Sequence, residues 1–359
     1  MNVLITGVTG MVGSHLVDYL IENTEWNIYG FIRWNDRLDN LEHHFDRINK
    51  KDRIFLINGD LNDLPSVISA VEESEANYVF HLAAQSYPKT SFSAPLETLQ
   101  TNIIGTANLM ESIRDYGEDD VVVHVCASSE IFGRVPKDKL PIDEECSIHP
   151  ASPYAISKVG TDLLGRYYAE AFGITIMTTR MFTHTGPRRG DVFSESTFAK
   201  QIAMIEAGLQ EPTIYVGNLD SLRTYADVRD AVEAYYLLVT KNPIGGEYYN
   251  IGGEYTCKIG DMLNYLISQS TSSLGAMPFA ISITVNNSDP FIFNFFLLKP
   301  SLNCKGSTPI PIKLERCILS KLSAITAFIP SNFVPFAAQS LDDPVPYSLP
   351  ATTIRSFPL

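Results

Sequence analysis

Tyr154 and Lys158 have residue types and a spacing that suit acid–base chemistry. They are four residues apart in Tyr-Ala-Ile-Ser-Lys, which places a phenol and an ammonium on one face of a helix. A free tyrosine titrates at about 10, so its use as a base at neutral pH requires a pKa lower by roughly three units. A nearby ammonium favours the phenolate. The pair also arises by chance on surface helices, so it predicts an active site only together with other residues.

A hydroxyl and a carboxylate, Ser128 and Glu130, follow the apolar residues 121–126 in the sequence. Residues 121–126 are predicted to form a strand, and parallel sheets carry their chemistry at the carboxyl ends of strands. Taken alone, Ser-Ser-Glu is equally typical of a helix cap or a turn. Together with Tyr154 and Lys158, it predicts a catalytic set of hydroxyl, carboxylate, phenol and ammonium.

A glycine-rich loop, GVTGMVG at residues 7–13, directly follows a predicted strand and opens a predicted helix. Glycines permit the tight turn and let the backbone approach a pyrophosphate, and the helix N-terminus offers N–H groups to phosphate oxygens. The spacing is GxxGxxG, and a plain structural turn is the alternative. The residues predicted to contact a dinucleotide here are Gly7, Thr9, Gly10, Met11, Val12 and Gly13.

The end of the second predicted strand, residues 26–32, bears on the choice between NAD and NADP. An acid at this position binds the ribose 2′-hydroxyl of NAD, whereas an arginine accommodates the 2′-phosphate of NADP. Arg33 follows the strand, and the first acid is Asp36. The sequence therefore predicts NADP, with a solvated loop arginine as the alternative interpretation of Arg33.

Strand-like and helix-like apolar patterns alternate along the first 181 residues. This alternation predicts an α/β fold, a doubly wound parallel (Rossmann) sheet with helices on both faces and a smaller second domain. The predicted strands are residues 2–6, 26–32, 53–57, 78–82, 121–126 and 174–181, and the predicted helices include 11–23, 65–73, 97–115 and 153–172.

The overall composition limits the classes of partner. A formal net charge of −14 argues against binding to a nucleic-acid backbone, which requires a basic surface. The five cysteines show no CxxC spacing, so we expect no metal site and a reducing compartment. We see no signal peptide, and the apolar residues 290–298 are too few to cross a bilayer. We therefore expect a cytoplasmic protein that binds no membrane.

Seven segments of the chain together resemble the extended short-chain dehydrogenase/reductase family, and more narrowly its GDP-mannose 4,6-dehydratase branch. The resemblance covers residues 1–272, and PRRG and GNLDSLR are its most discriminating segments. The matching segments are ITGVTGMVGSHL, GDLND, HLAAQS, SSEIFG, SPYAISK, PRRG and GNLDSLR.

The resemblance implies conversion of GDP-mannose to GDP-4-keto-6-deoxymannose, with loss of water after a transient oxidation at C4. Ser128 would bind the sugar 4-hydroxyl, and Tyr154 would remove its proton. Lys158 would hold the nicotinamide ribose and lower the pKa of the tyrosine, and Glu130 would take the C5 proton. NADP would stay bound through the cycle, in a homo-oligomer that is a dimer or a tetramer.

Further contacts are carried over from the family, motif by motif. For the cofactor they are Asp60, Leu61, Leu82, Ala83, Ala84, Gln85, Ser86, His184 and Arg189. For the nucleotide sugar they are Ser86, Thr183, Lys200, Asn218 and Arg223. Arg188 has two interpretations: a ligand contact within the PRRG segment, or a solvated surface charge.

The sequence departs from the family in two places. Thr183-His184-Thr185-Gly186 replaces the family's Asn-His-Glu-Ser, and the family's closing segment is missing after Ser272. Residues 274–359 hold only 10 of the 68 charged residues but 11 of the 21 prolines. We therefore predict an NADP-binding domain at 1–180, a partial nucleotide-sugar-binding domain at 181–273, and an atypical tail at 274–359. A related 4-keto reductase or epimerase, and a non-catalytic NADP-binding remnant, are the alternative functions.

Overall fold

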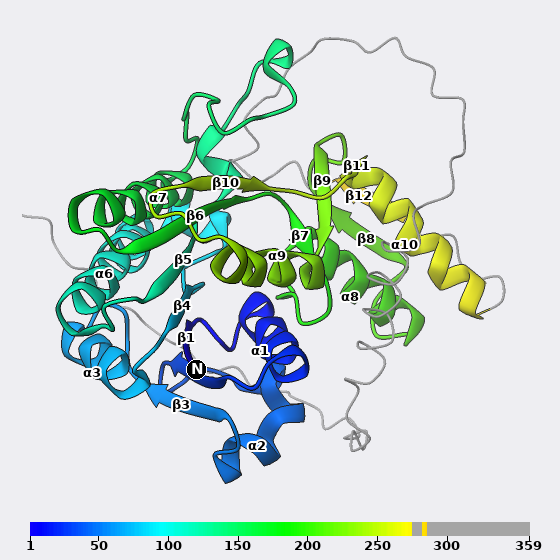
Figure 1. The fold of residues 1–359 in the computed structure, drawn as a ribbon. Helices are drawn as coiled ribbons and strands as arrows, with labels where there is room; N and C mark the ends of the chain where they lie inside the picture. The colour runs from blue at the N-terminus through cyan, green and yellow to red at the C-terminus, as the bar shows by residue number, and fades with distance from the viewer. Residues whose placement is uncertain (275–281, 286–359) are drawn as a thin grey trace, which may run out of the picture.

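A seven-stranded sheet forms the centre of the molecule, with strand order β10-β6-β5-β4-β1-β2-β3 and parallel pairing throughout (Figure 1). The computed structural model describes residues 1–274 and 282–285. The predicted doubly wound α/β fold is confirmed. The strands are β1 (Asn2–Thr6), β2 (Asn27–Ile32), β3 (Ile54–Asn58), β4 (Tyr78–His81), β5 (Val122–Cys126), β6 (Thr175–Met181) and β10 (Tyr248–Ile251).

Helices cover both faces of this sheet, each over its own apolar core. One core includes Val67, Leu109 and Tyr168, from α3 (Leu64–Ser74), α6 (Gly105–Tyr116) and α7 (Pro153–Phe172). The other includes Leu16 and Tyr235, from α1 (Met11–Asn23) and α9 (Val228–Lys241). None of the described helices combines the length and apolar character that crossing a bilayer requires. The shorter helical segments are η1 (Asp39–His44), α2 (Phe45–Lys50), α4 (Pro88–Ser93), α5 (Pro95–Leu99), η2 (Gln100–Ile104), η3 (Ser129–Phe132) and η4 (Lys137–Lys139).

Local sequence explains the bounds of α7, the helix that carries Tyr154 and Lys158. Ser152 caps its start by accepting a hydrogen bond from the Ala155 amide at 3.0 Å, and proline occupies the first helical position. Gly173 ends the helix in the left-handed region, with φ of 73°. The helix occupies residues 153–172, as the sequence predicted.

The predicted single helix at 97–115 is wrong in detail. The structure has α5, then one π-helical segment, η2, and then α6. A π turn inserts a residue without interrupting the helical run, so apolar periodicity alone does not reveal it.

A second lobe follows β6 and has its own apolar core, which includes Phe198, Ile202, Ile214 and Leu263. Its three-stranded sheet has the order β11-β9-β7, and β12 pairs in parallel with β8. Its elements are β7 (His184–Thr185), α8 (Ser194–Glu206), β8 (Thr213–Val216), β9 (Leu222–Asp227), β11 (Tyr255–Lys258), α10 (Ile259–Leu274) and β12 (Ser282–Val285).

The predicted domain bounds stay a prediction, although the structure adds two facts. Beyond residue 180, β10 returns to the main sheet and pairs with β6. Of the tail predicted from residue 274 onward, only residue 274 and β12 belong to the described residues.

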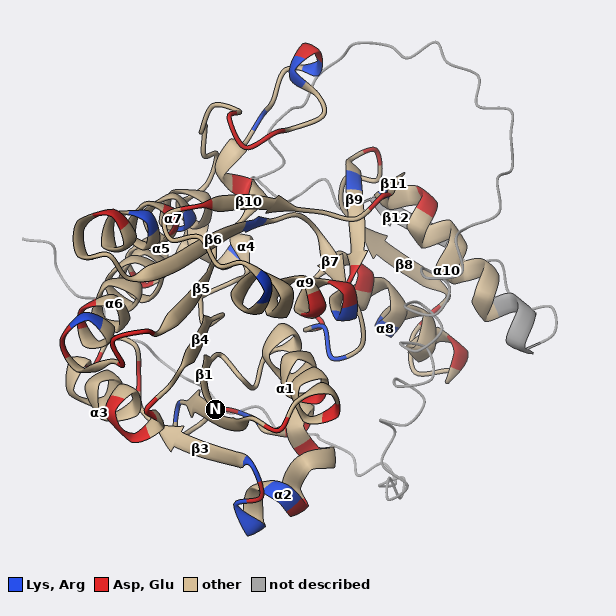
Figure 2. Cartoon of the chain, in the orientation of Figure 1, with Lys and Arg blue, Asp and Glu red and all other residues tan. Residues whose placement is uncertain are grey.

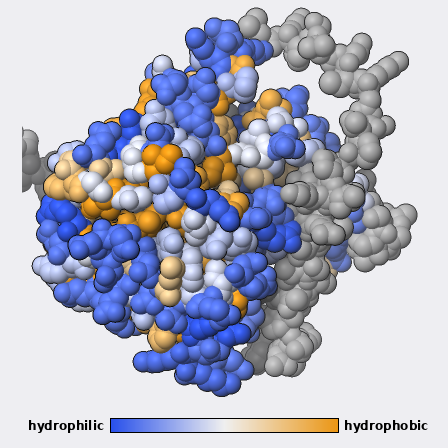
Figure 3. Space-filling model, viewed as in Figure 1, coloured by the Kyte–Doolittle hydropathy of each residue, from blue (hydrophilic) through white to orange (hydrophobic). Residues whose placement is uncertain are grey.

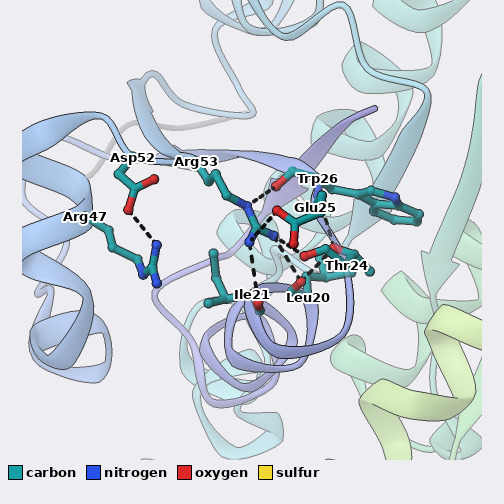
Figure 4. Close-up of polar contacts among 8 residues, drawn as sticks. All are labelled: Leu20, Ile21, Thr24, Glu25, Trp26, Arg47, Asp52 and Arg53. Atoms are coloured by element: carbon teal, nitrogen blue, oxygen red, sulfur yellow. Dashed lines mark hydrogen bonds and ion pairs between the residues drawn. The ribbon is translucent and has the colours of Figure 1, made fainter.

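Helix α1 is anchored at its carboxyl end by Arg53, which lies just before β3 (Figure 4). The guanidinium donates to the carbonyls of Leu20 at 3.3 Å and Thr24 at 2.5 Å, and also to those of Ile21 and Trp26. The last carbonyls of a helix lack partners within the helix and carry partial negative charge, so an arginine there satisfies both needs. Arg53 thus fixes the end of α1 that is far from the glycine loop.

The charged and apolar side chains are unevenly placed on the surface. Lys and Arg alternate with Asp and Glu along the helices instead of covering one continuous face in this view (Figure 2). Hydrophobic residues gather along the β10 side, while the face near α1 and α2 is mostly hydrophilic (Figure 3).

Candidate active site

The glycine loop is wound tightly against the end of β4, with no room for side chains. A Cβ atom on Gly7, whose φ is 74°, would lie 2.8 Å from the Cα of Ala83, and one on Gly13 would lie 2.3 Å from the Gly7 carbonyl oxygen. Gly10 begins α1 without a side-chain cap. The first-turn amides of this helix are therefore left to an outside acceptor, as a pyrophosphate site requires.

His81 fixes the strand ends that border this loop. Its ring nitrogens lie 2.8 Å from Thr6 Oγ1 and 2.9 Å from Thr106 Oγ1, and Thr6 Oγ1 accepts a hydrogen bond from the Ala83 amide. Burial lowers the pKa of His81 to about 3, so the imidazole is neutral. This residue opens the HLAAQS segment, yet sequence reasoning gave it no role.

The other predicted cofactor residues lie at the ends of β3 and β4. Leu61 is buried, and the Asp60 carboxylate accepts a hydrogen bond from the Asn62 amide at 2.9 Å. Leu82 and Ala84 are partly buried and Ser86 is exposed. The Gln85 side chain bonds to the backbone of Tyr87 at 2.7 Å, so it braces its own segment.

Arg33 lies at the end of β2, as predicted, but an acid accompanies it. Its guanidinium pairs with Asp36 at 2.9 Å, and the Asp36 carboxylate also accepts from Thr9 of the glycine loop at 3.4 Å. Sequence reasoning passed over Asp36 because it lies three residues beyond Arg33. The structure places both an arginine and an acid at the position that separates NADP from NAD.

The four predicted catalytic residues come from the end of β5 and the start of α7. Tyr154 and Lys158 are buried, 8% and 5% exposed, and Tyr154 is hydrogen-bonded to the Ser128 side chain. Lys158 Nζ donates to the Cys126 carbonyl at 2.7 Å, which ties α7 to the end of β5. Glu130 is exposed, and its amide donates to Ser128 Oγ at 3.2 Å.

The environment of Tyr154 pulls its pKa in opposite directions. Burial raises the pKa above the ordinary value, and the charge of Glu130 adds to that effect. The hydrogen bond from Ser128 and the positive charge of Arg189 act in the lowering direction. The sequence pointed to Lys158 as the cation that acts on Tyr154, and the structure adds Arg189.

A family model described as GDP-mannose 4,6 dehydratase matches residues 4–277. The chain belongs to the GDP-mannose 4,6-dehydratase family.

Similar curated proteins include a reductase and dehydratases. A GDP-6-deoxy-D-mannose reductase of Pseudomonas aeruginosa is 31% identical over 267 residues, which are 74% of this chain and 79% of that protein. A GDP-mannose 4,6-dehydratase of Yersinia enterocolitica is 31% identical over 67% of this chain and 64% of its own length. The dehydratase sdnI of Sordaria araneosa is 33% identical over 70% of this chain and 45% of its own length. The chain thus spans less than two thirds of these two dehydratases.

Two solved structures have the same fold. RMD from Pseudomonas aeruginosa complexed with NADPH has a TM-score of 0.69 and 26% identity, covering 91% of this chain and 100% of that one. The dTDP-glucose 4,6-dehydratase of Bacillus anthracis in complex with NAD has a TM-score of 0.66 and 22% identity, covering 80% and 85%. Fold neighbours thus hold a nicotinamide dinucleotide of either kind.

Arg189, predicted as a cofactor contact, also exerts its charge on Tyr154. It donates to the His184 carbonyl at 2.9 Å, lies 3.8 Å from the Phe193 ring centre, and is buried enough that its pKa is lowered. Burial and the neighbouring Arg189 charge lower the pKa of His184 to about 4. The second arginine of the PRRG segment is therefore a cation that acts on Tyr154 of the predicted catalytic set.

The residues predicted to hold the nucleotide sugar lie on the second lobe and bond locally. Lys200 on α8 pairs with Asp191 at 2.7 Å, and Arg223 on β9 donates to the neighbouring Leu222 carbonyl. Asn218 accepts from the Asp220 amide, and the Thr183 carbonyl accepts from the Ala226 amide. Lys200, Asn218 and Arg223 are exposed, and Thr183 is partly buried.

Proposed function

We propose that this chain is an NADP-dependent dehydratase of the family to which it belongs, converting GDP-mannose to GDP-4-keto-6-deoxymannose with loss of water. One observation supports this most strongly: the Tyr154 hydroxyl, at the start of α7, is hydrogen-bonded to Ser128, which follows β5 together with the exposed Glu130 carboxylate. The three groups supply a binding hydroxyl, a base for O–H and a base for C–H.

The glycine loop and Lys158 are the residues that would hold the cofactor, because the loop leaves free backbone amides and excludes side chains. Arg33 would accept the 2′-phosphate. When bound there, NADP would supply the hydride acceptor and donor for the transient oxidation at C4.

Tyr154 removes the proton from the sugar 4-hydroxyl while Ser128 donates a hydrogen bond to that oxygen. Because burial raises the pKa of Tyr154, its phenolate must be stabilised by the surrounding positive charges. Arg189 supplies one such charge. Lys158 is fixed by the Cys126 carbonyl and keeps its ammonium beside the same helix face.

Glu130 acts in the second half of the reaction. Once C4 is a ketone, the proton on C5 is acidic enough for a carboxylate to remove. Glu130 then passes this proton to the C6 hydroxyl, which leaves as water. Because Glu130 is exposed, its carboxylate can contact the sugar without a rearrangement of buried side chains.

The test is incubation of the full chain with GDP-mannose and NADP, followed by mass spectrometry. Loss of one water supports the proposal. Tyr154→Phe should abolish C4 oxidation, whereas Glu130→Gln should spare it and slow elimination by about 10²- to 10⁴-fold. Normal water loss by Glu130→Gln would refute the mechanism.

A 4-keto reductase is the second candidate. The match to this chain covers a larger share of the reductase of Pseudomonas aeruginosa than of either dehydratase named above. A reductase would consume NADPH with GDP-4-keto-6-deoxymannose and leave GDP-mannose unchanged. Incubation with each sugar separately therefore distinguishes the two activities.

We further propose that residues 1–180 hold the cofactor and residues 181–273 the sugar nucleotide. The glycine loop lies in the first segment and the exposed residues Lys200, Asn218 and Arg223 in the second. If so, Arg223→Met should weaken GDP-mannose binding and leave NADP binding unchanged, as isothermal titration calorimetry would show.

A further inference from the structure

Asp18, His43 and His44 form a cluster at the outer side of α1, away from the catalytic residues. Nε2 of His43 and Nε2 of His44 each lie 2.7 Å from the same oxygen, Oδ1 of Asp18. The two imidazole rings are 4.1 Å apart between centres. All three potential ligand atoms lie within 4.8 Å of one another.

Arg188 adds a fourth polar group to the cluster. Its Nη2 lies 2.7 Å from Oδ2 of Asp18 and 3.3 Å from Nε2 of His43. Nε2 of His43 must carry a hydrogen to donate to Asp18. The contact with Nη2 of Arg188 therefore places two hydrogen-bond donors side by side, which is unfavourable. Nη1 of Arg188 is buried and has no hydrogen-bond partner among the described residues. The guanidinium is therefore held by one good ion pair only.

Three groups converge on the Asp18 carboxylate: the two imidazoles at Oδ1 and the Arg188 guanidinium at Oδ2. Two imidazoles and one carboxylate form a ligand set that suits transition-metal ions. It suits magnesium and calcium less well, because these ions favour oxygen ligands.

We propose that Asp18, His43 and His44 bind a transition-metal ion of the zinc class, and that Arg188 is the competing cation that occupies the carboxylate when no metal is bound. Zinc ligands at about 2.0–2.2 Å in a tetrahedron are about 3.3 Å apart. Each imidazole nitrogen lies 2.7 Å from Oδ1, so each of these two nitrogen–oxygen pairs needs to separate by only about 0.6 Å.

The site is open enough to take up an ion from solution. The His43 side chain is 45% exposed and Asp18 is 24% exposed, so a water can complete the coordination. The face near α1 and α2 is hydrophilic (Figure 3). Metal binding would repel Arg188, whose backbone is held in the left-handed region with φ of 65°.

The experiment is calorimetric titration of the full chain with ZnCl₂, and of a second sample with CoCl₂ monitored by visible absorption. We expect one zinc ion bound with micromolar affinity, and cobalt bands of tetrahedral intensity. His43→Ala, at the exposed ligand, should weaken binding by at least about tenfold. Arg188→Met should strengthen binding by about tenfold, because it removes a like charge a few ångströms away.

His149→Ala, at an exposed histidine outside the cluster, is the matched control and should bind zinc as the wild type does. Because His44 is buried, His44→Gln is used in place of alanine, with circular dichroism to confirm folding. Three results would overturn the proposal: no zinc binding at millimolar concentration, zinc binding that survives His43→Ala and His44→Gln together, or unchanged affinity in Arg188→Met. None of these measurements needs cofactor or sugar, so they are independent of the proposed function.

Discussion

The glycine loop and the second lobe offer candidate binding groups of opposite kinds. At the loop the candidate binding groups are backbone amides, fixed by Gly7 and Gly13 at contacts too close for any side chain. On the second lobe the candidate binding groups are side chains such as Lys200 and Arg223, which are exposed and bonded to their near neighbours.

This difference shows where binding costs arise. A site made of fixed backbone amides is preorganised, and its ligand meets little loss of conformational freedom. Exposed side chains must leave their local partners and become ordered when the nucleotide sugar arrives. We therefore expect substitutions around the glycine loop to lower the stability of the fold. Substitutions on the second lobe should chiefly lower substrate affinity.

The largest expected effect is on the pH dependence of stability, through two buried histidines of the main sheet, His81 on β4 and His124 on β5. Burial lowers the pKa of His81 and of His124 to about 3 each, so both are neutral in the folded chain and gain protons on unfolding. Unfolding takes up protons below pH 6.5, so stability falls as the pH decreases toward 3. Between pH 7 and pH 5 each histidine should cost about 2 kcal/mol of unfolding free energy.

Urea titration at several pH values measures this dependence. His124→Gln should flatten it by about 2 kcal/mol over that range. The matched control His149→Gln, at an exposed position, should keep the wild-type slope. An unchanged slope in His124→Gln would show that His124 is not held neutral.

The next effect tests the anchoring of α1. Arg53→Met keeps much of the apolar stem but removes the donors to the carbonyls of Leu20, Ile21 and Thr24. We expect a loss of about 2–3 kcal/mol in unfolding free energy, since several hydrogen bonds from a charged donor are lost, while the Leu20 carbonyl keeps its bonds from Thr24. Arg47→Met, which breaks only the exposed pair with Asp52, should cost about 0.5 kcal/mol or less. Equal losses in the two variants would contradict the anchoring.

Cofactor selectivity at the end of β2 should change by about tenfold. Arg33→Ala removes the candidate partner of a 2′-phosphate, so it should weaken NADP binding and leave NAD binding nearly unchanged. Asp36→Asn removes the carboxylate that Arg33 and Thr9 contact, so it should favour NADP over NAD. Fluorescence titration with each cofactor measures both, and equal loss of NAD and NADP in Arg33→Ala would refute the assignment.

The smallest effect on stability is expected on the second lobe. Lys200→Met breaks an ion pair whose side chains are 53% and 62% exposed, so unfolding free energy should change by about 0.5 kcal/mol or less. GDP-mannose affinity should fall by roughly tenfold if Lys200 contacts the substrate. Lys258→Met, in the similarly exposed pair with Asp220, should change neither quantity. If both variants bind GDP-mannose equally well, the assignment of Lys200 is wrong.

Local sequence predicted the elements whose signals are local. Helix α1 and helix α7 match their predicted bounds because a glycine turn opens one and Ser152 with Pro153 opens the other. The break between α5 and α6 was missed, because a π-helical segment leaves the apolar pattern almost unchanged.

Contacts between distant segments could not be predicted in the same way. Asp18 and Arg188 are 170 positions apart, and no local pattern pairs them. The approach of Arg189 to Tyr154 likewise depends on how the chain returns from β6 to the catalytic strand ends. The family segments include Arg188, Arg189 and Tyr154 but not Asp18, and the partner of each side chain came only from the fold.

The return of β10 to the main sheet has a consequence for the order of events during synthesis. The chain leaves the sheet at Met181 and rejoins it at Tyr248, so β7, α8, β8 and β9 of the second lobe are inserted between two neighbouring strands. At ~5–20 residues per second, β6 waits ~3–13 s on the ribosome before its partner is made. During that interval β6 is an unprotected edge that can pair with another chain. A chaperone that shields this edge should therefore raise the yield of folded protein.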